Sequence, residues 1–292
     1  ANKEIMREAR VLADAGEAAG PGDLVIAVRA KDAAAAEAAL AEAARHLDAP
    51  RTASRAGAAW RPRTLRAAHQ QMADASLVLV SVSGDFAAAE AMKAINRGLD
   101  VMIFSDNVPL AQEVELKRAA RTLGRLVMGP DCGTAIIGGV PLAFANVVPP
   151  GDIAIIGASG TGIQEISCLV ARAGRGISHA IGTGGRDLKA EVGAITTLMA
   201  IDMLDADPAT KHIVIVSKPP AAEVAKAVLA RVGKSHKPFT ICFLGAVMDA
   251  LPANARSATT LDAAAASAVG RTIMPPRPTP PRARAGARLI RG

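Results

Sequence analysis

The chain has 292 residues, half of them apolar, which is enough to bury a sizeable core and predicts two domains. No apolar run reaches the roughly 18 residues of a membrane span, and no signal peptide pattern opens the sequence, so we expect a cytoplasmic protein without membrane partners. The net charge of +7 comes largely from six arginines that follow Asp262, and five Phe, one Trp and no Tyr offer little for base stacking. We therefore expect no nucleic-acid partner.

Residues 1–63 read as an N-terminal α/β segment of a longer region. Residues 2–15 predict a helix, 24–28 a strand, and 32–47 an alanine-rich helix that Asp32 caps. The first helix starts with no upstream structure to pack on, which suggests a portion of a longer chain.

Residues 64–148 predict a first parallel domain in which strands alternate with helices. Its strands are expected at 77–82, 101–104 and 126–128, its helices at 85–97 and 110–123, and a hairpin at 136–142. The Gly138-Gly139 pair between apolar residues is the hairpin signal.

Residues 149–270 repeat this alternation and predict a doubly wound sheet. Strands are expected at 153–156, 178–181, 213–217 and 239–244. Ligands of such sheets bind outside the carboxyl ends of the strands. Residues 271–292 are rich in Pro and Arg and predict a disordered linker.

The most suggestive stretch is Gly157–Gly162, with the sequence GASGTG, which follows a buried strand and precedes a helix expected to begin near Ile163. It is neither a dinucleotide fingerprint nor a P-loop, because its glycines are spaced differently and no Lys-Ser/Thr pair follows. One interpretation is a tight turn without a ligand. The other is a cradle of N–H groups for an anion at a helix's positive end.

A second loop, residues 183–187, supports the anion interpretation, because Arg186 offers a guanidinium suited to oxyanions. Lys218 follows another buried strand, and it is either a solvated lysine or a cation at the same crevice. His179 is either a packed core histidine or a catalytic one. Cys132, with Cys168 and Cys242, reads as a reduced thiol rather than a disulfide or zinc ligand, so no metal site is expected.

From about 77 to 245 the sequence resembles the α subunit of succinyl-CoA synthetase. The matching features are Met128-Gly-Pro-Asp-Cys132, the strand and loop 151–161, the Gly182-Thr-Gly-Gly185 loop and Asp207-Pro-Ala-Thr210. It is more similar to the FdrA group of that superfamily, on GASGTGIQE, SHAIGTGGRDL, VSKPP and SDNVPL. The resemblance implies a Rossmann-like CoA-binding-type domain at 64–148, then a flavodoxin-like ligase-type domain at 149–270.

Three elements of the synthetase pattern are missing here. No histidine stands in or after the loop 245–250, where the synthetase carries its phosphohistidine; Lys218 replaces a supporting glutamate; and no CoA-contacting glycine loop occurs around 28–32. These departures argue against CoA, and no other cofactor is expected.

The FdrA resemblance implies a subunit of an oxamate carbamoyltransferase, which acts in allantoin breakdown together with other subunits. Such an enzyme converts oxalurate and phosphate to oxamate and carbamoyl phosphate. The alternatives are an acyl-CoA synthetase and a non-catalytic scaffold that positions partners or self-associates.

Under this resemblance, phosphate or carbamoyl phosphate is the expected ligand, with Arg186 and Lys218 as catalytic residues. The expected phosphate-binding residues are Gly157, Ser159, Gly160, Thr161, Gly162, Gly184 and Gly185. Substrate contacts are expected at Asn107, Asp131, Cys132 and His179.

Overall fold

The computed structural model describes residues 2–20, 23–48, 62–246, 248 and 250–272. The chain divides into two compact units, residues 1–61 and 62–292. The predicted linker lies almost entirely outside the described residues. None of the described helices combines the length and the apolar character that a membrane span requires.

The first unit contains α1 (Asn2–Glu8), α2 (Asp14–Ala18) and α3 (Ala33–Asp48). The α3 helix begins where expected, because the Asp32 carboxylate accepts the N–H of Ala35 at 2.8 Å. The predicted helix at 2–15 is instead two helices, separated by Arg10 at a φ of 53°. The predicted strand at 24–28 is wrong: no described strand of this unit pairs with it.

A three-stranded parallel sheet, in the order β1-β2-β3, opens the second unit. Its elements are α4 (Leu65–Gln71), β1 (Leu77–Val80), α5 (Gly84–Ile95), β2 (Asp100–Ile103), α6 (Leu110–Thr122) and β3 (Val127–Met128). Helices α5 and α6 cover one face through side chains such as Ile95 and Leu116. Met102 and Met128 on the other face pack into the core of the larger sheet, so the two sheets share buried apolar area.

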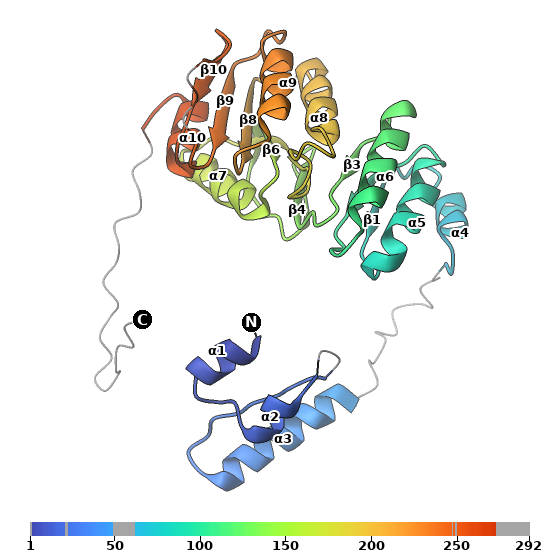
Figure 1. Cartoon of the computed structure of the whole chain (residues 1–292), viewed down its shortest axis with the longest axis vertical. Helices are drawn as coiled ribbons and strands as arrows, with labels where there is room; N and C mark the ends of the chain where they lie inside the picture. The colour runs from blue at the N-terminus through green and yellow to red at the C-terminus, as the bar shows by residue number, and fades with distance from the viewer. Residues whose placement is uncertain (1, 21–22, 49–61, 247, 249, 273–292) are drawn as a thin grey trace. The chain divides into compact units, whose positions relative to one another are not determined.

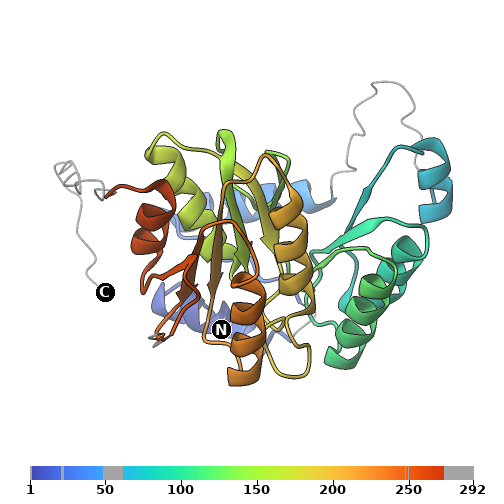
Figure 2. The ribbon, with the colours of Figure 1, turned by 90° about the horizontal axis from the view of Figure 1, so that it is seen from above.

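The larger sheet has seven strands in the order β10-β9-β8-β6-β7-β4-β5. Its elements are β4 (Thr134–Ile137), β5 (Val140–Ala143), β6 (Pro150–Gly157), α7 (Gly160–Arg172), β7 (Ile177–Gly182), α8 (Ile195–Ala206), β8 (His212–Ser217), α9 (Ala222–Val232), β9 (Phe239–Phe243), β10 (Ala255–Ser257) and α10 (Leu261–Val269). Helices α7 and α10 pack together on one face, and α8 and α9 on the other (Figures 1 and 2). The predicted α/β architecture with parallel-dominated sheets is confirmed.

The order of the five parallel strands is that of a flavodoxin-like sheet, with β6 as its first strand and β7 as its second. After β7 the chain crosses back over β6 to form β8. The direction of winding therefore changes between β6 and β8, which is where ligands of doubly wound sheets bind.

Two details differ from the sequence interpretation. The hairpin β4–β5 pairs with β7 through Ile136 and Ala180, so it belongs to the larger sheet although it precedes the predicted boundary at 148. Helix α7 begins at Gly160 rather than near Ile163 because Ser159 caps it, its Oγ accepting the N–H of Gly162 at 3.2 Å.

Candidate functional site

The loop that follows β6 lies at the change of winding. The N–H of Ala158 donates to the carbonyl oxygen of Val216 on β8 at 3.1 Å, and the N–H of Thr183 donates to the carbonyl oxygen of Gly157 at 2.8 Å. The loops after β6, β7 and β8 therefore start side by side at one edge of the sheet. This arrangement brings together the three segments that the sequence singled out.

The amino end of α7 presents two N–H groups at this edge. The Gly162 N–H donates to Ser159 Oγ and the Ile163 N–H to the Ser159 carbonyl oxygen, whereas those of Gly160 and Thr161 find no acceptor among the described residues. Unsatisfied N–H groups at a helix's positive end form a ready anion site. Of the predicted phosphate ligands, Gly160 and Thr161 have the available donors.

A cleft of about 580 Å³ opens in front of these donors. It is lined by residues that follow β1, β2 and β3 on one side and by the start of α7 on the other: Ser81, Val82, Phe104, Ser105, Asp106, Asp131, Gly133, Thr134, Phe144, Ala158, Gly160, Thr161, Gln164 and Gly185. The carboxyl ends of the two sheets thus face each other across one space. We take this cleft as the candidate site.

The wall of the cleft depends on close backbone approach between the loop 129–134 and the loop after β7. A Cβ atom at Gly182 would lie 2.5 Å from Cys132 Sγ, and one at Gly184, whose φ is 83°, would lie 2.4 Å from the Pro130 carbonyl oxygen. Only glycine fits at these two positions. Gly184 therefore shapes the site, while Gly185 lines it.

Behind the loop 183–187 lies a fully buried ionic network. Lys117 Nζ donates to Glu113 Oε1 at 2.9 Å, to Asp187 Oδ1 at 2.8 Å and to the Thr183 carbonyl oxygen at 3.0 Å. The Asp187 carboxylate also accepts from the N–H groups of Thr196 and Thr197 at the start of α8. Lys117 thereby ties α6 of the smaller sheet to the loop that borders the cleft.

Arg186 joins the same network rather than pointing freely into the cleft. Its Nε lies 2.8 Å from Glu113 Oε2, an ion pair in which the N–H is not directed at the oxygen, and its Nη2 donates to the Val108 carbonyl oxygen at 2.8 Å. The side chain is 32% exposed, so part of the guanidinium still reaches solvent.

Lys218 directly follows β8 at the change of winding and is exposed. Asn107 is exposed at a φ of 54°, and Asp131 lines the cleft. Cys132 is buried, and burial raises the pKa of its thiol to about 11, which keeps it protonated and unreactive.

His179 lies elsewhere. It stands in the first half of β7 and lines a separate cavity with Asp207 at the amino ends of the strands. The structure does not bring it together with the cleft residues.

Several cleft residues were not predicted as site residues from the sequence. Gln164 Nε2 donates to Thr134 Oγ1 at 3.0 Å and to the Phe144 carbonyl oxygen at 3.1 Å, which fixes the side wall. The rings of Phe104 and Phe144 meet edge to face with centroids 5.1 Å apart. Ser105 and Asp106 could have been found, because both follow a predicted strand directly.

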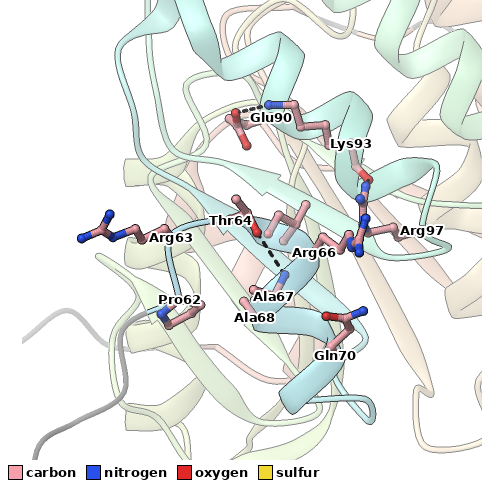
Figure 3. A pocket seen from close by; sticks show the side chains of 11 residues that line it. Pro62, Arg63, Thr64, Arg66, Ala67, Ala68, Gln70, Glu90, Lys93 and Arg97 are labelled. Atoms are coloured by element: carbon pink, nitrogen blue, oxygen red, sulfur yellow. Dashed lines mark hydrogen bonds and ion pairs between the residues drawn. The ribbon is translucent and has the colours of Figure 1, made fainter.

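A basic groove of about 870 Å³ between α4 and α5 is a different feature. Figure 3 shows Arg63, Arg66, Lys93 and Arg97 around it, with Lys93 paired to Glu90 at 2.6 Å. It shares no residue with the cleft. Its arginines are solvated surface side chains, and we do not assign it to the candidate site.

The fold is an α/β architecture with parallel-dominated sheets, and the cleft lies at the carboxyl ends of their strands. Residues 149–245 match the family described as "CoA binding domain". That match falls on the domain with the GASGTG stretch, whereas the sequence interpretation assigned the CoA-binding type to 64–148. Residues 1–62 match the family described as "AllF, heavy metal-associated domain".

Among curated proteins, the chain is 43% identical over 244 residues to the uncharacterized protein YahF of Escherichia coli strain K12, covering 83% of this chain and 47% of YahF. It is 24% identical over 151 residues to the ADP-forming sulfoacetate-CoA ligase subunit SauD of Bilophila wadsworthia, covering 49% and 50%. It is 26% identical over 153 residues to the succinate–CoA ligase [ADP-forming] subunit alpha 2 of Archaeoglobus fulgidus, covering 50% and 51%. The chain spans about half the length of these relatives.

Among solved structures, the ATP citrate lyase of Methanothrix soehngenii in complex with citrate and coenzyme A shares the fold. Its TM-score is 0.54 at 19% identity, over 71% of this chain and 37% of that one. Together the matches support the superfamily of succinyl-CoA synthetase α-like proteins, a superfamily that includes CoA ligases. These matches support neither membership of the FdrA group nor a carbamoyl-transfer activity.

The first unit does not fit a heavy-metal site. Residues 1–62 contain no cysteine and one histidine, His46, which is exposed and lies 2.9 Å from Glu42. Soft metals select thiolate and imidazole ligands. Within the described parts of the chain, no group of three or more His, Cys, Asp or Glu side chains is placed to hold a metal ion.

Proposed function

We propose that this chain is a subunit of an acyl-CoA-ligase-type enzyme and that its cleft binds phosphate or an acyl phosphate at the amino end of α7. The relatives named as CoA ligases are subunits, which supports a partner chain. The observation that carries the proposal is the pair of N–H groups at Gly160 and Thr161, which have no acceptor in the described part of the chain and lie at the change of winding of the sheet.

The residues fit one phosphoryl group at the helix end. The Thr161 hydroxyl is a further polar group at the helix end, and Lys218, which directly follows β8, would offset the phosphate's negative charge. The carboxylates of Asp106 and Asp131, across the cleft, would repel a second phosphate but suit a donor group such as an amide or hydroxyl. The site is thus better matched to a small acyl phosphate than to a polyphosphate.

CoA fits only in part. Its phosphates could use the α7 donors and its apolar arm could lie along Phe104 and Phe144, and when bound it would supply a thiol that carries the acyl group. The chain's own contribution is to hold the phosphate and exclude water from it.

The proposed step needs no phosphohistidine, and the loop 245–250 contains no histidine. A phosphate oxygen attacks the acyl carbonyl carbon, a C–O bond forms, and the previous substituent leaves with its bonding electron pair and takes up a proton. Oriented N–H groups stabilise the charge on phosphate throughout.

Carbamoyl is the second candidate for the acyl group. The absence of a histidine from the loop 245–250 is compatible with this candidate, because oxalurate and phosphate exchange the carbamoyl group without a phosphoenzyme. Oxamate then leaves as carbamoyl phosphate forms. This finer assignment rests on the resemblance to the FdrA group.

The test is calorimetric titration of the full chain with phosphate, acetyl phosphate, carbamoyl phosphate and CoA, repeated with Thr161→Glu. A carboxylate in the first turn favours the helix but repels phosphate, so we expect binding to be lost without loss of stability. Ala263→Glu, in the first turn of α10, is the matched control and should bind like the wild type. Absence of saturable phosphate or acyl phosphate binding, or equal binding by Thr161→Glu, would leave only the scaffold role.

A further inference from the structure

A second cavity lies at the opposite, amino-terminal edge of the strands. It has a volume of about 270 Å³, close to the lower limit of about 300 Å³ for small-molecule pockets. Its lining residues come from both sheets: Ser76, Leu77, Asp100, Leu126, Met128, Ile137, His179, Ile181, Met203, Leu204 and Asp207. Sites between two packed lobes are common locations for ligands.

The lining combines an apolar body with negative charge. Leu126, Met128, Ile181 and Leu204 are almost fully buried and form its floor. The ionisable groups on it are two carboxylates and one imidazole, and no Lys or Arg is among the lining residues. A ligand that fits both properties has an apolar body and one positive charge.

His179 contributes no positive charge to this cavity. Its Nδ1 accepts the N–H of Gly138 at 3.1 Å, which assigns the ring proton to Nε2. Burial lowers the pKa of the ring below its ordinary value, although the Asp207 charge opposes this effect. The neutral ring therefore does not offset the Asp207 charge, and the neighbouring cation, Lys237, donates to the Leu204 and Asp207 carbonyl oxygens rather than to the carboxylate.

The Asp207 carboxylate is held in place and is not saturated. Its Oδ2 accepts from Thr210 Oγ1 at 2.6 Å and its Oδ1 from the Ala209 N–H at 3.1 Å. The hydrogen bond from Thr210 is the main cause that lowers the pKa of Asp207, so the group is ionised. His179 Nε2 stands 3.7 Å from Oδ2, too far for a hydrogen bond, and each oxygen keeps acceptor capacity for a ligand.

We propose that this cavity is a binding site for a small organic ammonium ion. The ammonium group donates to Asp207 at the mouth, and the apolar body lies against Leu126, Met128 and Leu204. Asp100, whose Oδ1 accepts the Leu126 N–H at 2.8 Å, adds negative potential from the smaller sheet.

A ligand bound at this site would affect the cleft at the other edge of the sheets. Met128 directly precedes the loop 129–134, and Ile181 directly precedes Gly182, where an added Cβ atom would collide with Cys132. A ligand that bridges the two sheets here stabilises their packing and, with it, the walls of the cleft. The site itself does not rest on the proposed function, because its evidence is the cavity and its charges alone.

The test is a titration of the full chain with benzylamine, followed by calorimetry and ligand-observed NMR, with benzyl alcohol and benzoate as comparators of the same shape. We expect saturable binding of benzylamine and at least about tenfold weaker binding of the other two, since a charge-assisted hydrogen bond is lost. Asp207→Asn should weaken benzylamine binding by a similar factor. Asp202→Asn, an exposed aspartate on α8, is the matched control and should leave it unchanged.

A second variant keeps the test valid if Asp207→Asn disturbs the 207–210 turn. Met203 is 47% exposed at the mouth, and Met203→Lys should compete with the ligand's charge while Met203→Gln should not. Lack of saturable binding by the wild type, which would mean a water-filled cavity only, or equal binding of benzylamine and benzyl alcohol, overturns the proposal. Phosphate binding at the cleft should persist in Asp207→Asn, so the two proposals can fail separately.

Discussion

Replacing Lys117 with methionine should destabilise the second unit strongly. The side chain is 0% exposed, and its ammonium holds three acceptors, on Glu113, Asp187 and the Thr183 carbonyl group. Methionine keeps the apolar stem but removes the charge. Glu113 would keep Arg186 as its cation, whereas Asp187 would lose the only cation with which it pairs among the described residues.

The magnitude follows from the number of groups left without a partner. Removing one member of a buried ionic network costs about 3–5 kcal/mol. That is a large part of a typical total stability of about 5–15 kcal/mol. At about 2–4 °C per kcal/mol for a domain of this size, the melting temperature should fall by roughly 6–20 °C.

Urea denaturation and calorimetry would measure this change, with Lys93→Met as the control. Lys93 forms the same kind of helical Glu–Lys pair with Glu90, but both side chains are exposed, so its loss should cost only about 0.3–0.5 kcal/mol. If Lys117→Met cost no more than Lys93→Met, the network would not hold the loop 183–187, and the argument for its role would fail.

Three further perturbations have defined outcomes. Gly184→Ala should lower the free energy of unfolding by about 1–3 kcal/mol because of its φ of 83° alone, and by more because of the Pro130 contact. Gly185→Ala, with open space around it, should change the free energy of unfolding by no more than about 0.5 kcal/mol in denaturant titration. Equal costs would contradict the close approach at Gly184. Burial lowers the pKa of His212 from 6.5 to about 4, so the unfolded chain takes up the proton first and stability should be lost as pH falls from about 6.5 to 4, by at most about 3 kcal/mol. His212→Gln should flatten this part of the pH profile, and an unchanged slope would assign it to other groups. Cys132, with its pKa raised to about 11, should resist iodoacetamide in the native protein and react in urea, as peptide mass spectrometry would show; rapid native labelling would disprove its burial.

The sequence predicts the elements of the larger sheet well because their signals are local. The apolar runs that became β6, β7, β8 and β9 lie within a few residues of their expected bounds. The α7 start was misplaced by three residues, since the cap at Ser159 lies inside a glycine-rich stretch that reads as a loop. The segment 24–28 failed because a strand needs a pairing partner, which no single segment specifies.

The site was only partly predictable for the same reason. Gly160, Thr161, Gly185 and Asp131 line the cleft as the strand-end argument indicated. The pairing of Arg186 with Glu113 joins segments far apart in the chain, and no local pattern marks it. The resemblance suggested His179 as a substrate contact, but it stands three residues before the end of β7 and lines the other cavity.

The hairpin β4–β5 limits how this protein can be divided. Strand β4 of this hairpin pairs with β7 through Ile136 and Ala180, yet the hairpin comes directly after the segment that closes the smaller sheet. A cut near residue 148, where the Pro149-Pro150 pair suggests a boundary, would leave the larger sheet with an uncovered edge and the other fragment with an orphaned hairpin. Anyone who exchanges modules between members of this superfamily should therefore cut before residue 134 and transplant the hairpin together with the flavodoxin-like sheet.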